Sequence, residues 1–198
     1  MTTVESRKHW RDMMHFDSRG MVCCTLSLAR RYVVDYPRDG FGWLLLGISL
    51  CAVARYTEAL SALRAASRLC PPTQVHLVRN NFGRLYQQKG NFRRAETWFR
   101  RAIQSSPLDA TSYIYLGALL GLEGRLMESE AVHRRATLCE GGCIDEAFFN
   151  LGLVLRAQEK YPEAIACFQK ALAIDPTYKL AIKELADMSK AMESIHIA

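Results

Sequence analysis

Apolar and polar residues follow one another along this chain in a pattern that favours helices over strands. Stretches rich in Ala, Leu, Arg and Glu lie between widely spaced Gly and Pro residues, and few β-branched runs alternate with polar residues. The most apolar stretch, residues 41–54, has 14 residues, which is short of the roughly 20 that a membrane-spanning helix needs. Residues 179–195 are predicted to form one amphipathic helix without a partner. We therefore expect an all-α chain.

Small residues recur along the chain at a nearly constant interval. The glycines Gly47, Gly83, Gly117 and Gly152 are 36, 34 and 35 residues apart. Twelve residues after each glycine comes another small residue, in the order Ala59, Ala95, Ser129, Ala164. A closing residue follows in each period, in the order Pro71, Pro107, Gly141, Pro176. A fixed period of this length is typical of repeat architectures built from paired helices.

The recurring residues have a joint physical interpretation. Glycine inside a helix costs about 1 kcal/mol against alanine, so four in register require a packing reason. We expect that the small residues of the two helices let their backbones approach closely where the helices cross. Proline ends each second helix because it cannot continue one, and Gly141 is expected to do so as a left-handed cap. Gly90 and Gly124 are expected to open the turns between paired helices.

The complete pattern resembles the tetratricopeptide repeat, in which W-x2-L-G, Y, A-x3-F-x2-A and P follow one another within a single repeat unit. Residues 40–73 supply Trp43, Leu46, Gly47, Tyr56, Ala59, Leu63, Ala66 and Pro71. Residues 145–178 supply Phe148, Leu151, Gly152, Tyr161, Ala164, Phe168, Ala171 and Pro176. The two central repeats depart from the pattern, because Arg79 replaces an early aromatic residue and His133 a later one.

The resemblance implies one domain over residues 1–198, a right-handed α-solenoid of about five antiparallel helix pairs and a capping helix. The expected repeats are 40–73, 76–109, 110–143 and 145–178, and residues 179–195 form the cap, which argues against a longer array. A degenerate pair is expected over residues 6–39, with Met13 and Thr25 where Gly and Ala are usual. This pair is expected to cover the apolar residues 41–54; the alternative is an exposed patch that docks an amphipathic helix.

Stacked pairs present a concave surface lined by their first helices, and the resemblance implies that this groove binds an extended peptide or an amphipathic helix of another protein. Counting inward-facing positions from each repeat start selects the candidate partner-binding residues Phe41, Leu44, Ile48, Leu77, Asn80, Asn81, Arg84, Gln88, Ile114, Tyr115, Phe149, Asn150 and Arg156. The groove is expected to be apolar at one end and polar in the middle. A scaffold or adaptor is the predicted function, and a chaperone for partly unfolded or secreted clients is the alternative.

Two asparagines, Asn81 and Asn150, share one repeat position, where family members often hold the backbone of a bound peptide. An amide offers both a donor and an acceptor to an extended chain. The clamp that some family members use for chaperone tails needs a lysine, an asparagine and an arginine at positions that are occupied here by Leu44, Ile48 and Tyr115, respectively. A co-chaperone of that kind is therefore not expected.

Charge adds one feature to this interpretation. The chain carries a formal net charge of +6, and residues 79–101 hold seven Lys and Arg against Glu96 alone. Such a segment can attract an acidic partner. RNA is the rival partner, but the arginines fall on a second helix, away from the groove, and few aromatics are available there to stack on bases. We expect a protein partner and not a nucleic acid.

The sequence contains no set of residues that would indicate an enzyme. The five histidines are far apart, no phosphate-binding glycine loop occurs, and His133, Cys139 and Cys143 match no standard zinc arrangement. Neither a cofactor, a metal nor a small-molecule substrate is expected, although Cys139 and Cys143 could form a redox-sensitive pair. An odd cysteine count and a charged N-terminal segment without an apolar signal core predict a cytoplasmic protein.

Overall fold

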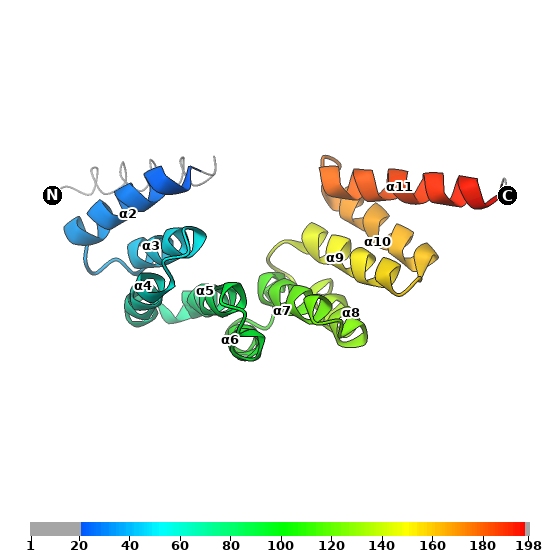
Figure 1. The fold of residues 1–198 in the computed structure, drawn as a ribbon. Coiled ribbons are helices and arrows are strands. Elements are labelled where there is room, and N and C mark those ends of the chain that lie inside the picture. The colour runs from blue at the N-terminus through cyan, green and yellow to red at the C-terminus, as the bar shows by residue number, and fades with distance from the viewer. Residues whose placement is uncertain (1–20, 197–198) are drawn as a thin grey trace. The chain divides into compact units, whose positions relative to one another are not determined.

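The protein was analysed as a computed structural model, which describes residues 21–196, with side chains described for residues 21–190. This part of the chain forms ten α-helices and one short 3-10 helix and contains no strand (Figure 1). The all-α prediction is therefore confirmed. The first helix expected within residues 6–39, with Met13, lies outside the described residues. The chain divides into two compact units, Met1–Ser105 and Ser106–Ala198, and each has a core of its own.

In the first unit, two helix pairs follow a single helix. Within each pair the two helices pack together, the second helix of one pair contacts the first helix of the next, and the leading helix packs on the first pair. The two first helices also contact each other. The elements are α2 (Val22–Asp35), α3 (Gly40–Ala52), α4 (Tyr56–Leu69), η1 (Pro72–Gln74), α5 (Val75–Gln88) and α6 (Phe92–Ser105).

The second unit contains two further helix pairs and closes with a longer helix. Its elements are α7 (Ala110–Leu122), α8 (Leu126–Ala136), α9 (Ile144–Ala157), α10 (Tyr161–Ile174) and α11 (Lys179–His196). Helix α11 packs on α10 and buries Ala181 and Met188 in the core. None of the helices in the described part of the chain combines the length and apolar character that a membrane crossing requires.

The four glycines in register lie where the two helices of a pair meet. A Cβ atom added to Gly83 would lie 2.4 Å from Cε1 of Phe99, and one added to Gly152 would lie 2.5 Å from Cε1 of Phe168. The nearest atoms thus belong to a large side chain of the second helix, not to the small residue that recurs in step with the glycine. The expectation of close packing holds, but its reason differs: each glycine makes room for a buried ring or leucine of the second helix.

The end of α8 differs from the sequence expectation. The residue with left-handed backbone conformation is Gly142 (φ 84°), not Gly141. Helix α8 ends earlier, at Ala136, and Thr137 follows it in a right-handed conformation. The backbone of Gly141 instead pairs with the segment before α7, because its N–H donates to the Leu108 carbonyl and its carbonyl accepts from Ala110 N at 2.9 Å. Gly141, which stands where other repeats have proline, therefore forms a backbone bridge and does not cap α8.

The turns between paired helices all contain one residue with positive φ. Gly90 and Gly124 occupy this position as expected, with φ of 72° and 75°. The equivalent residues of the first and last full repeats are Ala54 and Glu159, with φ of 58° and 62°. A side chain in this region of backbone conformation costs roughly 1–2 kcal/mol.

Replacing Ala54 by glycine is therefore expected to raise the free energy of unfolding by about 0.5–1 kcal/mol, after the greater flexibility of glycine in the unfolded chain is subtracted. Urea denaturation followed by circular dichroism would measure the change. Ala166→Gly, in the middle of α10, serves as the control and should lower the stability by about 1 kcal/mol. If both variants lose stability equally, the turn of Ala54 is not strained.

Candidate partner-binding face

A hollow lies between the first helices α3 and α5 of the first unit. It has a volume of about 50 Å³, enough for one small group of a partner. We refer to it as the α3–α5 hollow; its lining residues are Ile48, Cys51, Ala52, Asn81, Arg84 and Gln88. Four of these six were predicted from the sequence as partner-binding residues, and the structure brings them together.

The polar side of the α3–α5 hollow is held by hydrogen bonds within α5. Asn81 Nδ2 donates to the Leu77 carbonyl at 2.9 Å, and Asn81 Oδ1 accepts from Arg84 Nη1 at 3.5 Å. The amide of Asn81 thus orients the guanidinium of Arg84 while part of its own donor capacity is used by the helix backbone. The charged group that this side of the hollow offers to a partner is Arg84.

The apolar side of the hollow is formed by Ile48, Cys51 and Ala52 of α3. Burial raises the pKa of the Cys51 thiol to about 11, although the nearby charge of Arg84 acts in the opposite direction. Cys51 therefore remains a neutral thiol at physiological pH and behaves as a small apolar residue. The hollow combines an apolar wall with one positive charge, which suits a carboxylate or carbonyl oxygen next to an apolar side chain.

Other predicted groove residues of the first unit are less accessible. Leu44 is only 6% exposed and Asn80 only 2%, so neither offers much surface to a partner, and we do not carry them further as binding residues. Both side chains are buried, because some positions of a first helix that the repeat count assigns to the groove in fact face the core. Phe41 and Leu77 are partly buried at the edge of the same core.

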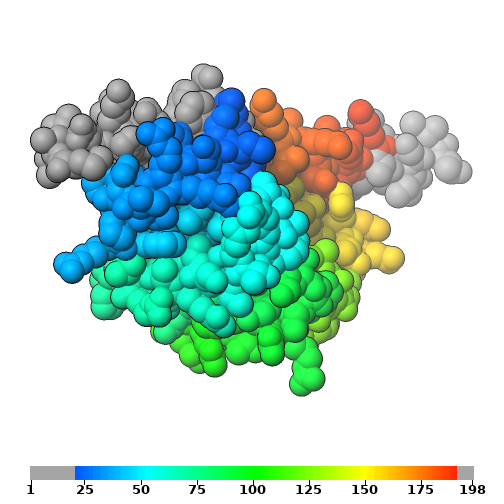
Figure 2. All heavy atoms as spheres, turned by 60° about the vertical axis from the view of Figure 1, so that its left-hand side comes forward, coloured from blue at the N-terminus to red at the C-terminus, as the bar shows by residue number. Residues whose placement is uncertain are grey.

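The apolar helix α3 is covered on one side by α2. The α2 residues Ala29, Tyr32 and Val33 are buried in the same core as the leucines of α3, and Gly42 of α3 approaches the Tyr32 ring closely. Figure 2 shows the blue residues of α2 lying directly on the residues that follow them. Helix α2 thus contributes to burying the apolar stretch 41–54, and the remainder of the pair that was expected to cover it lies outside the described residues.

In the second unit, the predicted residues mostly serve internal packing. Ile114 and Phe149 are buried, and the ring of Phe149 lies 5.0 Å from that of Tyr178, between centroids. Arg156 forms an ion pair with Glu184 of α11, so it ties the last helix to α9. Ile114 and Phe149 are therefore not available to a partner, whereas the side chain of Arg156 stays exposed with its charge paired.

Two further predicted residues of the second unit, Tyr115 and Asn150, are partly buried. Asn150 Nδ2 donates to the Glu146 carbonyl at 3.0 Å, which is the same bond within one helical turn that Asn81 makes. The shared asparagine position therefore has a shared structural role in both units. Burial and the charge of Asp145 raise the pKa of the Glu146 carboxyl, so this part of α9 disfavours a further negative charge.

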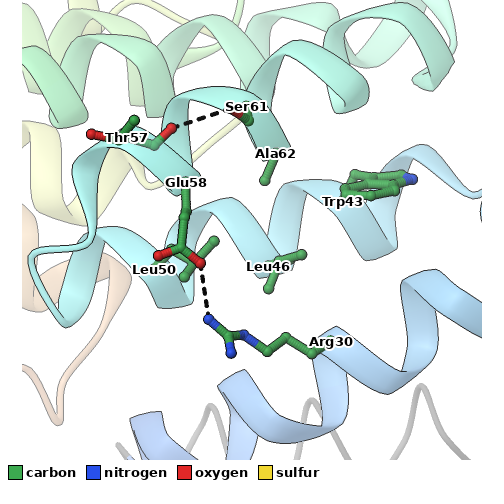
Figure 3. Close-up of a pocket in the computed structure, with 8 residues that line it drawn as sticks. All are labelled: Arg30, Trp43, Leu46, Leu50, Thr57, Glu58, Ser61 and Ala62. Atoms are coloured by element: carbon green, nitrogen blue, oxygen red, sulfur yellow. Dashed lines mark hydrogen bonds and ion pairs between the residues drawn. The ribbon is translucent and has the colours of Figure 1, made fainter.

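A second hollow of about 250 Å³ lies between α2, α3 and α4. Its apolar residues are Leu46, Leu50, Ala62 and Trp43, and the ion pair of Arg30 with Glu58, 3.0 Å long, crosses it (Figure 3). Sequence reasoning missed this hollow because its parts come from three helices. Trp43 and Leu46 are repeat-pattern residues, but their positions predicted packing and not a hollow.

Cys139 and Cys143 do not have the properties of reactive cysteines. Burial raises the pKa of both thiols, and the nearby carboxylate of Asp109 raises both further. A thiol with a raised pKa forms little thiolate and reacts slowly. The redox-sensitive pair considered from the sequence thus gains no support from its surroundings.

Comparison with known proteins agrees with this architecture. Residues 77–106 and 145–178 match the tetratricopeptide repeat family. These two segments are tetratricopeptide repeats. A thermophilic tetratricopeptide-repeat protein of Thermus thermophilus superposes with a TM-score of 0.72 at 18% identity, over 92% of this chain and 98% of the other. YrrB, described as having an unusual peptide-binding site, gives a TM-score of 0.56 at 19% identity, over 87% of both chains. The predicted tetratricopeptide solenoid fold is thereby confirmed.

Two human proteins are similar in sequence. Protein O-mannosyl-transferase TMTC1 is 28% identical over 56% of this chain, and tetratricopeptide repeat protein 7A is 31% identical over 60%. The chain spans only 16% and 13% of their respective lengths. The similarity therefore concerns only a part of much longer proteins.

Proposed function

We propose that this protein binds a segment of another protein through its first unit, with the α3–α5 hollow as the anchoring point, and acts as a scaffold or adaptor without chemistry of its own. The observation that carries the proposal is the convergence of Ile48, Asn81, Arg84 and Gln88, chosen from the repeat register, on one hollow. The repeat family generally mediates protein–protein interaction, and YrrB, which has a similar fold, has a peptide-binding site according to its description.

The chemistry of the hollow defines the segment that it would hold. Arg84 favours an oxygen that carries negative charge, and the wall of Ile48 and Cys51 favours a neighbouring apolar side chain. An extended peptide or an amphipathic helix that combines both groups would satisfy the two sides at once. The transferase named among the relatives supplies no reason to assign chemistry here, because the match covers a small part of that protein.

The proposal is tested with a random peptide library displayed on phage and selected against the full chain. Arg84→Ala is expected to lower the affinity for the selected peptides about tenfold or more. A hydrogen bond to a charged group contributes about 1.5–3 kcal/mol to binding. Fluorescence anisotropy with labelled peptides would measure the affinities.

Two further variants keep this test interpretable. Gln88→Ala, at an exposed position of the same hollow, should also weaken binding without affecting folding. Arg135→Ala, an exposed arginine of α8 in the second unit, should leave the affinities unchanged. Selected peptides that bind the Arg84 and Gln88 variants as tightly as the unmodified protein would exclude the α3–α5 hollow as the binding site.

A further inference from the structure

Positive charge is distributed unequally between the two units. Residues 1–105 carry 17 Lys and Arg against 7 Asp and Glu, a net charge of +10, whereas residues 106–198 carry 9 against 13, a net charge of −4. Within the described part of the first unit, the last helix carries more of this excess than any other helix. Helix α6 presents four exposed arginines and only one acidic residue, Glu96; the arginines are Arg93, Arg94, Arg100 and Arg101. We call these four residues the arginine face of α6.

One of these arginines stands where the other repeats have an acidic residue. Arg94 occupies the repeat position of Glu58, Glu128 and Glu163. Each of those glutamates lies in the first turn of its helix and forms an ion pair, with Arg30 and Arg55, with Arg125, and with Arg134, respectively. In α6 this pairing is replaced by a positive charge.

The arginines at the start of α6 do not serve the stability of the helix. Arg93 and Arg94 lie in its first turn, which contains no acidic residue. The N-terminal end of a helix carries partial positive charge, so a cation there costs about 0.3–1 kcal/mol instead of contributing it. A sequence that breaks a local stability rule at one repeat out of four indicates a function at that site.

Three of the four arginine side chains are held in place by aromatic rings or by hydrogen bonds. The Arg94 guanidinium lies 5.5 Å from the Tyr86 ring centre, and that of Arg101 lies 5.1 Å from the Trp98 ring centre. Arg100 donates to Oε1 of Glu96 through Nε at 2.9 Å and Nη2 at 2.7 Å. Side chains that are already restrained in this way lose less conformational entropy when they bind a partner.

We propose that the arginine face of α6 is a second interaction surface, separate from the α3–α5 hollow, and that it binds a segment of a partner protein rich in aspartate and glutamate. Charge complementarity identifies the partner as an anion, and two observations favour a polypeptide over a nucleic acid. Two of the rings beside these arginines are occupied, since Arg94 and Arg101 lie over Tyr86 and Trp98 and Trp98 also stacks on Phe82, at 4.5 Å between centroids, which leaves Phe92 as the exposed ring of α6 on which a base could stack. Four arginines are also fewer than the roughly 6–10 phosphate contacts of a strongly salt-dependent nucleic-acid binder.

The proposal is tested on the full chain with a labelled glutamate-rich peptide, a glutamine-rich peptide of the same length and a single-stranded oligonucleotide of the same charge. The unmodified protein should bind the glutamate-rich peptide and lose affinity for it as salt is raised. The double variant Arg93→Glu with Arg94→Glu should weaken this binding about tenfold or more. The same variant should unfold at a temperature no lower than the unmodified protein, because it restores glutamate to the first turn of α6.

A matched control changes the net charge by the same amount in the second unit. Arg135→Glu with Lys170→Glu alters the residues at the repeat position of Arg101 and should leave the peptide affinity within about twofold, because neither residue belongs to the arginine face of α6. Equal weakening in both double variants, or equal binding of the glutamine-rich peptide, would overturn the proposal. Tighter binding of the oligonucleotide, lost in the α6 variant, would overturn it in favour of a nucleic acid.

Discussion

The stability of the protein is expected to fall by about 2 kcal/mol between pH 7 and pH 5 through the protonation of one buried histidine. His133 is only 1% exposed, and neither of its ring nitrogens has a hydrogen-bond partner in the described structure. Burial lowers the pKa of His133 from 6.5 to about 4. Between these values the unfolded chain binds a proton that the folded chain does not, so the free energy of unfolding decreases as the pH falls.

His133→Phe isolates this effect. Phenylalanine is the residue at the same position of the second and fourth repeats, where Phe99 and Phe168 are fully buried. The variant should be more stable by about 1–3 kcal/mol at pH 7, because it removes buried nitrogens without partners. The difference in stability between the two proteins, from urea denaturation, should grow as the pH falls from 6.5 towards 4. A difference that does not change with pH would show that His133 does not titrate in this way.

Replacing Gly83 by alanine is expected to destabilise the protein by about 1–3 kcal/mol, even though alanine is the better helix former. The added Cβ would lie 2.4 Å from Cε1 and 2.5 Å from Cδ1 of Phe99. The Phe99 ring is completely buried, so it cannot move aside without disturbing its neighbours. Thermal or urea denaturation of the purified variant would measure the loss.

Gly121 provides the matched control, because it also lies in a first helix, α7, but outside the glycine register. A Cβ added there would meet only Ser129 Oγ, at 3.5 Å, which is an ordinary contact. Gly121→Ala should therefore gain up to about 1 kcal/mol from helix propensity. Opposite signs for the two glycines support the packing role of the register. The same sign for both would contradict it.

Much of the fold follows from the repeat register because that register is itself a packing requirement. The recurring glycine identifies the first helix of each pair, and the ring or leucine that follows it in step identifies the second. Spacing alone could not show which residue of the second helix each glycine contacts, because both a small and a large residue of that helix recur in register with the glycine. The three-dimensional structure shows that each glycine meets the large side chain.

The candidate site was predictable where the first helices remain open and not where other elements cover them. Counting helical positions found Ile48, Asn81, Arg84 and Gln88, which line the α3–α5 hollow. The same count selected Phe149, which is buried against Tyr178, and Arg156, which pairs with Glu184. Helical periodicity gives the direction of a side chain, but not the neighbour that it meets. Such neighbours come from segments distant in sequence.

Hydrogen–deuterium exchange with a peptide selected from the random library tests the central claim most directly. If the α3–α5 hollow is the binding site, the peptide should slow exchange at backbone amides in α3 and α5, around residues 48–52 and 81–88, and this protection should disappear in the Arg84→Ala variant. Protection confined to α4 or α6, or to the second unit, with α3 and α5 unchanged, would contradict the assignment of this hollow as the partner-binding site.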